Sequence, residues 1–263
     1  LECPLTYDGD SYGIDFAALE RGLAEPLTTM MILCNPHNPV GRIWSREELA
    51  RIGELCRRYG VTVLSDEIHC DLTDPEVGYV PFASVSRECA ANSVTCVAAS
   101  KAFNLAGLQS AAVVIPNEFL RNKVVRGLNS DEVAEPNCFA TLAAATAFGS
   151  CGDWLDELRA YLAENKRTVS EFVSREIPGI HVVGQNATYL LWIDCSAITD
   201  DTDGLADHIR RTTGLYLTAG GQYRGNGRYF LRMNTACQRK TLIDGLERLR
   251  VGVADYCRTK VDI

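Results

Sequence analysis

The sequence lacks several features that mark other classes of protein. No apolar run approaches the roughly 20 residues needed to cross a bilayer. Positive charge is not in excess, because 26 Lys and Arg stand against 34 Asp and Glu, for a formal net charge of -8 at pH 7. This balance argues against nucleic acid or an anionic membrane as the main partner. The opening, LECPLTYDGD, has no basic segment followed by an apolar one, so we expect no signal peptide.

Closely spaced cysteines are also lacking. The 11 cysteines are scattered, and none belongs to a C-x-x-C pair. An odd number, with many members in apolar stretches, indicates reduced thiols that pack as small hydrophobic side chains. Zinc sites need ligands close in sequence, so we expect no metal. Reduced thiols are typical of the cytoplasm, where we therefore expect the protein. The chain does not begin with Met and opens in what resembles a loop, so we expect an N-terminal part to be missing.

Apolar strands and amphipathic helices alternate in the first half of the chain. Residues 45–60 have helical periodicity, and Ser45 with Glu48 forms a capping box. Apolar, strand-like runs occupy 30–36, 61–67, 93–100 and 110–116. Buried strands separated by helices predict an α/β fold with a mostly parallel sheet and helices on both faces. In such sheets, ligands bind at the carboxyl ends of the strands, where this chain places polar clusters.

The second half predicts a smaller α+β domain. A long helix is expected over 152–177, where Pro178 ends it. Strand-like segments at 188–195 and 229–236 alternate with helices near 202–212 and from about 239. We therefore expect a large domain over 1–150 that lacks its N-terminal part, and a small C-terminal domain over 151–263.

Two charged residues lie at the predicted carboxyl edge of the sheet. Lys101 follows an apolar strand directly after Ser100, and a lysine desolvated there can lose its proton and form a Schiff base with a carbonyl. Asp66 ends another buried strand and needs a cationic partner, which a protonated pyridine nitrogen would supply. The alternatives are a surface lysine and helix capping by Ser65, Asp66 and Glu67.

Two further residues fit ligand binding. In NPHNPVG (35–41), two Asn-Pro steps and a Gly force a non-helical turn that can hold the Asn38 amide against a ring oxygen. Arg232 lies on the apolar strand FLRMN and is suited to a bidentate grip on a carboxylate. The alternatives are a tight connection for the turn and a structural salt bridge for Arg232.

These residues, in this order, resemble the class I/II aminotransferase family of pyridoxal-phosphate (PLP) enzymes, fold type I. They resemble more closely its cystathionine β-lyase branch of C–S lyases. NPHNPVGR, SDEIH and SKAFNLAGL carry the resemblance, which extends over nearly the whole chain, from YDGDSYGIDFAALE to YFLRMNTACQR. The resemblance implies a catalytic Lys101 that binds PLP as a Schiff base and shuttles protons. It also implies that Asp66 pairs with the pyridine nitrogen and that Arg232 takes the substrate α-carboxylate.

The remaining cofactor contacts are implied in the same way. Asn38 would bond the ring hydroxyl, His69 would stand where many relatives have a tyrosine touching that oxygen, and Ser100 would contribute to phosphate binding. A polar core histidine is the alternative for His69. Gln109 stands where aspartate-type aminotransferases have a phosphate-binding arginine, and this departure weakens the aminotransferase interpretation. Ala99 replaces the proline usual in the lyase branch.

The resemblance therefore implies a β-lyase acting on L-cystathionine or related cysteine S-conjugates, which releases thiol, pyruvate and ammonia. It also implies a homodimer. The family's phosphate loop, the aromatic residue that stacks on the pyridine, and a residue donated across the dimer precede the start of this chain. An aminotransferase is the alternative reaction, and a PLP-fold regulatory protein or inactive fragment is the alternative without catalysis.

Overall fold

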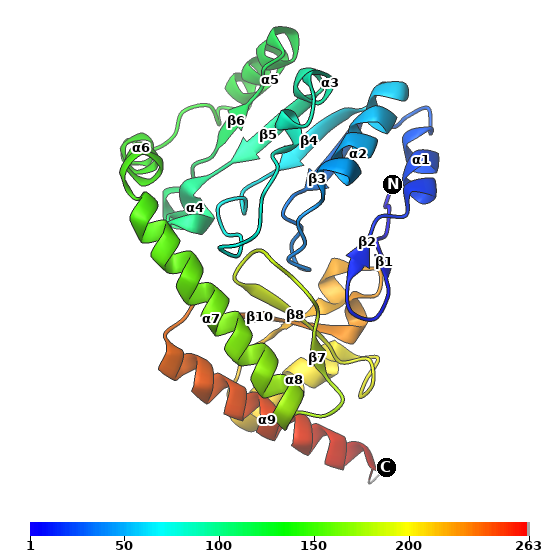
Figure 1. Cartoon of the computed structure of the whole chain (residues 1–263), viewed down its shortest axis with the longest axis vertical. Helices are drawn as coiled ribbons and strands as arrows, with labels where there is room; N and C mark the ends of the chain where they lie inside the picture. Colours follow the sequence, from blue (N-terminus) through cyan, green and yellow to red (C-terminus); the bar gives the residue numbers. More distant parts are fainter. Residues whose placement is uncertain (262–263) are drawn as a thin grey trace. The chain divides into compact units, whose positions relative to one another are not determined.

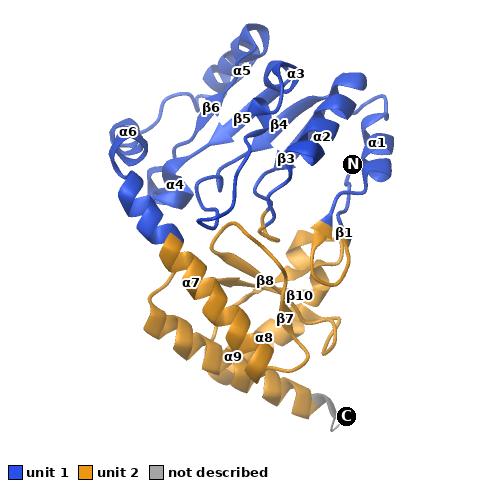
Figure 2. Ribbon diagram, in the orientation of Figure 1, with its two compact units in different colours: residues 1–6, 13–37, 42–159 blue, residues 7–12, 38–41, 160–263 orange. Residues whose placement is uncertain are grey.

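The computed structural model describes residues 1–261, which form two compact units (Figure 2). Unit 1 contains Leu1–Thr6, Gly13–His37 and Arg42–Arg159. Unit 2 contains Tyr7–Tyr12, Asn38–Gly41 and the chain from Ala160 onward. Two short segments from the first part of the chain thus belong to unit 2. The last boundary between the units, after Arg159, falls inside a long helix. The domain boundary expected after residue 150 stays a prediction.

A four-stranded sheet forms the centre of unit 1, in the order β3-β4-β5-β6 (Figure 1). Its strands are β3 (Met30–Cys34), β4 (Thr62–Asp66), β5 (Ser93–Val97) and β6 (Ala112–Val114). The first three are parallel, so their carboxyl ends meet at one edge, where Cys34, Asp66 and Cys96 are neighbours in register. This edge is where the sequence predicts the polar clusters to gather.

The expectation that 110–116 forms another buried strand is wrong. β6 is shorter, all three of its residues are exposed, and it pairs with β5 in the antiparallel direction. After β5 the chain turns through α4 (Ala99–Ala102) and η2 (Ala106–Leu108) at the carboxyl edge. It re-enters the sheet from that same edge, and so it must run back against β5.

One face of this sheet packs against helices α1 (Phe16–Leu23), α2 (Arg46–Arg58) and α3 (Arg87–Ala91). The core there includes Leu49 and Ile52 of α2 against Leu33 and Val63 of the strands. The capping box predicted for α2 is confirmed, because the Ser45 side chain accepts from the N–H of Glu48 and the Glu48 side chain accepts from that of Ser45. The short helix η1 (Phe82–Ser84) adds Phe82 to the same core.

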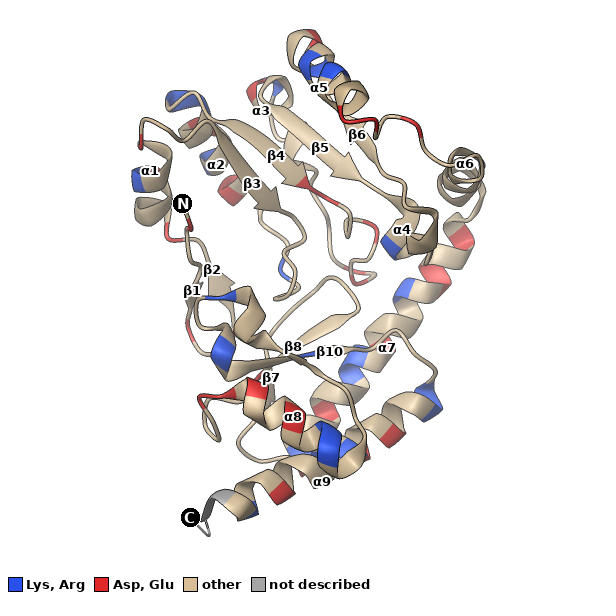
Figure 3. Cartoon of the chain, turned by 180° about the vertical axis from the view of Figure 1, so that it is seen from behind, with Lys and Arg blue, Asp and Glu red and all other residues tan. Residues whose placement is uncertain are grey.

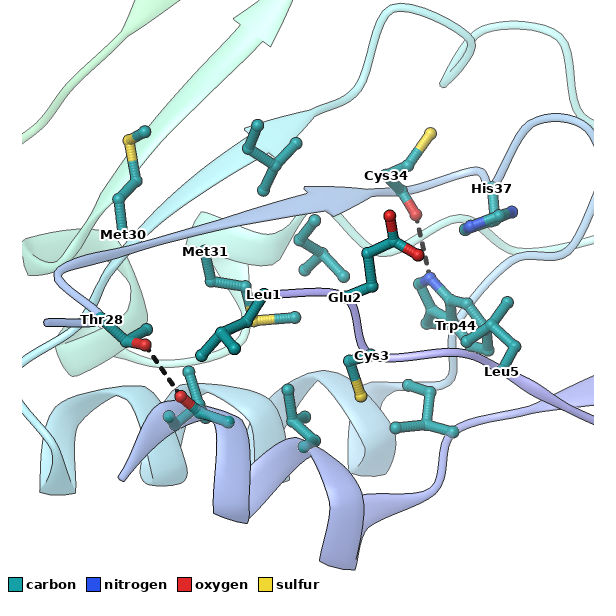
Figure 4. A pocket seen from close by; sticks show the side chains of 16 residues that line it. Leu1, Glu2, Cys3, Leu5, Thr28, Met30, Met31, Cys34, His37 and Trp44 are labelled. Carbon is teal, nitrogen blue, oxygen red and sulfur yellow. Dashed lines mark hydrogen bonds between the residues drawn. The ribbon is translucent and has the colours of Figure 1, made fainter. Parts of the chain in front are cut away.

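A cavity of about 400 Å³ lies beside β3 in unit 1 (Figure 4). Its lining is mostly apolar and comes from the N-terminal segment, α1 and β3. Trp44 closes one side, and its Nε1 donates to the carbonyl of Cys34 at 2.9 Å. The ring of His37 meets that of Trp44 edge-on, with centroids 5.9 Å apart.

The rest of unit 1 contains α5 (Glu118–Ser130), α6 (Ala140–Ser150) and the first turns of α7 (Gly152–Glu176). Several large apolar side chains here are open to solvent: Phe119 and Leu142 are each 70% exposed, and Ile32 on β3 is 68% exposed. Such side chains favour association in water when they gather in patches.

Unit 2 has an antiparallel sheet in the order β7-β8-β10-β9. The strands are β7 (His181–Val182), β8 (Leu190–Asp194), β9 (Thr218–Ala219) and β10 (Phe230–Asn234). Helices α7, α8 (Thr202–Thr213) and α9 (Arg239–Val261) bury an aliphatic core against it that includes Val169, Ile209 and Leu246. The short hairpin of β1 (Thr6–Tyr7) and β2 (Tyr12–Gly13) is tied to this unit by the hydroxyl of Tyr7, which donates to Asp194 Oδ2 at 2.8 Å. The smaller α+β domain is thus present.

The cysteines are all free thiols, and Cys56, Cys89 and Cys195 are buried. Burial raises the pKa of Cys56 to about 12, so this thiol stays protonated. Basic and acidic residues both occur along α7, α8 and α9 (Figure 3). Within residues 1–261, no helix is long and apolar enough to span a membrane, and no group of His, Cys, Asp and Glu is arranged to hold a metal ion.

Candidate active site

Asp66 is the last residue of β4 and is half-buried at the carboxyl edge. Its Oδ1 accepts a hydrogen bond from the N–H of Ile68 at 3.3 Å. Burial, followed by the negative charges of Asp66 and Glu67, raises the pKa of the neighbouring Cys96 thiol. The region around Asp66 is therefore one in which a positively charged group is favoured.

Lys101 lies in α4, the single helical turn that follows β5. The side chain is half-buried, whereas Ala99 and Ala102 beside it are buried. Phe103 anchors the turn, since its ring stacks on Trp154 with centroids 5.8 Å apart. Ser100 is half-buried, and its carbonyl accepts from the N–H of Leu105 at 3.1 Å. The structure thus places Ser100 and Lys101 beyond the end of β5, next to the strand that ends in Asp66.

His69 is 3% exposed, in the turn after β4. The carbonyl of His69 accepts from the N–H of Leu72 at 3.0 Å, which closes this turn. Arg159 fixes the following loop, because its Nε donates to the carbonyl of Thr73 at 2.9 Å and its Nη2 donates to Thr73 Oγ1 at 3.0 Å. This contact of Arg159 was not predictable from the sequence, since the helical pattern of 152–177 does not show which arginine reaches a distant loop.

Asn38 and Arg232 come together in unit 2. Arg232 lies on β10, and its Nη1 is 3.5 Å from Asn38 Oδ1. The guanidinium carbon lies 5.2 Å from the centre of the Tyr223 ring, within cation–π range. Within the described residues Arg232 forms no ion pair, so the alternative of a structural salt bridge has no support there. This arginine keeps a charge that a ligand carboxylate would neutralise.

The segment Asn38–Gly41 is held by its backbone. The carbonyl of Gly41 accepts from the N–H groups of Asn186 at 3.1 Å and Ala187 at 3.0 Å. Gly41 has φ of +66°, a conformation that suits glycine. These bonds join the turn predicted at 35–41 to the loop before β8, so the turn carries Asn38 toward Arg232.

The structure therefore places the predicted residues in two groups. Asp66, His69, Ser100 and Lys101 lie in unit 1 around the carboxyl ends of β4 and β5, and Asn38 and Arg232 lie together in unit 2. The hydrogen bond between Glu67 and Tyr79, which is partly buried behind Asp66, was not predicted from the sequence. The motif SDEIH contains Glu67, but the sequence gives no signal for its partner in an irregular loop.

Known proteins resemble this chain over almost its whole length. Cystathionine beta-lyase PatB of Bacillus subtilis is 42% identical over 254 residues, which are 97% of this chain and 66% of PatB. Protein MalY of Escherichia coli is 31% identical over 246 residues, which are 93% of this chain and 62% of MalY. The chain thus spans slightly less than two thirds of the length of these relatives.

Solved structures agree with the expected fold type I. Cystalysin of Treponema denticola, whose crystal structure contains a pyridoxal 5'-phosphate cofactor, superposes with a TM-score of 0.93 and 29% identity, over 97% of this chain and 65% of cystalysin. A PLP-bound putative aminotransferase from Clostridium difficile gives a TM-score of 0.92 with 31% identity, over 96% of this chain and 65% of that protein. The predicted fold class is confirmed.

The same conclusion follows from family-level comparison. Residues 3–249 match the family described as Aminotransferase class I and II. This match includes every predicted site residue. The chain belongs to the aminotransferase class I and II family.

Proposed function

We propose that the protein is a PLP-dependent C–S β-lyase that acts on L-cystathionine or a related cysteine S-conjugate. The similarity to PatB at 42% identity supports this reaction. The observation that carries the proposal lies in unit 1, where the carboxylate of Asp66 ends β4 and the amine of Lys101 follows the neighbouring β5 at the same sheet edge. Within residues 1–261, neither Asp66 nor Lys101 takes part in an ion pair.

These side chains fit PLP by their chemistry. A carboxylate without a protein cation suits the protonated pyridine nitrogen, and an amine without a carboxylate partner suits the aldehyde. We propose that Asp66 and Lys101 hold these two ends of the cofactor. In our proposal Asn38 and His69 bond the ring hydroxyl, and Ser100 contributes to binding the phosphate.

The proposed reaction uses the chain's own residues for binding and proton transfer. Arg232 binds the substrate α-carboxylate through paired N–H donors. Lys101 Nζ, as a free amine, acts as general base and takes the proton from Cα. When bound, PLP supplies the electron sink that stabilises negative charge at Cα. The Cβ–S bond then breaks, and the thiolate leaves with the bonding electrons.

The overall reaction balances with one water molecule. L-Cystathionine and water give homocysteine, pyruvate and ammonia, with no external oxidant or reductant. An aminotransferase would instead pass the amino group to a keto acid and release no thiol. A regulatory protein or inactive fragment would do neither.

The experiment is an assay of thiol and pyruvate release from L-cystathionine by the PLP-saturated protein. Equal amounts of both products are expected, with the release lost in Lys101→Ala. The matched control is Lys240→Ala, which removes an exposed lysine of α9 and should keep the activity. Amino-group transfer to a keto acid without thiol would show an aminotransferase, and absence of both reactions would overturn the enzymatic proposal.

We also propose that the protein is a cytoplasmic homodimer. Exposed apolar side chains such as Phe119 and Leu142 support an association. Sedimentation equilibrium would contradict the dimer if the PLP-saturated protein had the mass of a single chain. Fractionation of the native cells tests the cytoplasmic location. Recovery of the protein outside the cytoplasmic fraction would contradict it.

A further inference from the structure

Asp66 ends β4 and Glu67 follows it, and the environments of these two acidic residues differ. Asp66 is half-buried, whereas Glu67 is 2% exposed. The N–H of Glu67 donates to the carbonyl of Cys96 at 2.9 Å, so strand pairing continues through this residue. Because successive strand residues point to opposite faces, Glu67 lies on the buried face, behind Asp66.

Glu67 accepts three hydrogen bonds. Its Oε1 accepts from Ser65 Oγ at 2.8 Å and from the N–H of Phe82 at 3.0 Å. Its Oε2 accepts from the Tyr79 hydroxyl at 2.6 Å. All three partners are donors, which is the arrangement that stabilises an ionised carboxylate away from water. Burial and the charge of Glu67 raise the pKa of Tyr79, so its hydroxyl keeps the proton that it donates.

The same network reaches the strand on the other side of Asp66. The Tyr79 hydroxyl lies 3.1 Å from the carbonyl of Asn35, a residue that is fully buried. The N–H of Asn35 donates to the carbonyl of Asp66 at 3.0 Å. The side-chain amide of Asn35 is itself fixed, because it donates to the carbonyl of Val80 at 3.2 Å. Asp66 is therefore held through its own carbonyl and through the residue that follows it.

We propose that Glu67 is a positioning residue for Asp66, and that its buried negative charge strengthens the hold of Asp66 on the protonated pyridine nitrogen. A neighbouring negative charge stabilises the cationic partner of a carboxylate, and poor screening in the interior keeps this effect strong. This inference rests on the proposed binding of PLP at Asp66 and Lys101. It adds a second carboxylate that acts through Asp66 without touching the cofactor.

The test compares Glu67→Gln, which keeps the shape and removes the charge, with Tyr79→Phe, which keeps the charge and removes one donor. Tyr256→Phe is the matched control, because it removes a buried hydroxyl that lies 3.0 Å from Thr199 in unit 2. For each full-length variant, PLP affinity is measured by titrating the visible absorption of the lysine-bound cofactor. The pH profile of that absorption and the thermal unfolding temperature without PLP are recorded in parallel.

We expect Glu67→Gln to weaken PLP binding about tenfold or more, and to shift the pH profile of the visible absorption. Tyr79→Phe should weaken binding less and leave the profile in place. Tyr256→Phe should lower the unfolding temperature only. A Glu67→Gln protein that unfolds earlier but keeps the unaltered affinity and pH profile would show a merely structural role and overturn the proposal.

Two other outcomes are also decisive. If Glu67→Gln does not fold, the PLP affinity of Tyr79→Phe is compared with that of Tyr256→Phe. A weaker affinity in Tyr79→Phe supports the inference, and an affinity that is no weaker overturns it. If the unaltered protein shows no lysine-bound PLP, the cofactor proposal and this inference fail together. Loss of thiol release alone, with normal PLP binding in the unaltered protein, contradicts the lyase assignment and leaves the role of Glu67 intact.

Discussion

At the scale of single residues, Arg232 depends on the geometry of its guanidinium. The group lies beside Asn38 Oδ1 and the Tyr223 ring, and a lysine ammonium could not offer paired donors from the same position. We expect Arg232→Lys to raise KM for the amino-acid substrate roughly 10- to 100-fold, with a smaller change in kcat. Steady-state kinetics of the PLP-saturated protein measure both constants.

Arg228→Lys is the control for this prediction. Arg228 is an exposed arginine whose guanidinium carbon lies 4.7 Å from the centre of the Tyr229 ring, and it is outside the candidate site. Its replacement should leave KM close to that of the unaltered protein. Equal values of KM in Arg232→Lys and Arg228→Lys would contradict the assignment of Arg232 to the carboxylate.

At the scale of elements, the turn that carries Asn38 depends on Gly41. A Cβ at this position would lie 2.9 Å from the carbonyl oxygen of Ala187 and would overlap the side chain of Gln185. The φ of +66° adds a conformational cost for alanine. We expect Gly41→Ala to lower the free energy of unfolding by about 1–3 kcal/mol, as measured by urea denaturation.

Gly127→Ala provides the comparison for Gly41→Ala. Gly127 lies within α5, where an added Cβ would meet no atom within 4 Å. Alanine there should leave stability unchanged or raise it by up to about 1 kcal/mol, because alanine favours helix. If both substitutions changed stability by the same amount, the constraint at Gly41 would be absent.

Elements with strong local signals were predictable from the sequence. The capping box of Ser45 and Glu48 and the helical periodicity after it located α2, and Pro178 set the end of α7 within a few residues. Helix α5 was missed because it buries no residue and has no clear apolar stripe. The direction of β6 was also missed, since apolar content shows that a strand exists but not from which edge it enters the sheet.

In the candidate site, too, some placements were predictable from the sequence and some contacts were not. The placement of Asp66 and Lys101 at one edge was predictable, because strand ends and parallel pairing put them there. The pairing of Asn38 with Arg232 depends on residues 194 positions apart, and the bonds from Gly41 to Asn186 and Ala187 that create it have no local signal. The hydrogen bond between Glu67 and Tyr79 is hidden for the same reason, because Tyr79 lies in a loop without periodicity.

At the scale of the whole molecule, stability should fall in mild acid partly because of His37. Burial lowers the pKa of His37 to about 4 in the folded protein, against about 6.5 in an unfolded chain. As the pH falls, the unfolded state therefore binds the proton first. The stability that comes from a neutral His37 is complete above about pH 6.5 and is lost as the pH falls toward 4.

The variant His37→Gln, which stays neutral, tests this dependence. The free energy of unfolding in urea is measured at pH 7 and near pH 4.5 for both proteins. We expect a smaller loss between these two pH values in the variant. An equal loss would mean that His37 takes up its proton without cost in the folded state.

In our proposal, Lys101 holds PLP at the carboxyl edge of the sheet in unit 1. The most direct measurement is borohydride reduction of the PLP-saturated protein, followed by mass spectrometry of its peptides. We predict that the peptide containing Lys101 carries the cofactor, and that the label disappears in Lys101→Ala. A label of equal yield on Lys240 or another lysine, or a label that persists in Lys101→Ala, would contradict the account.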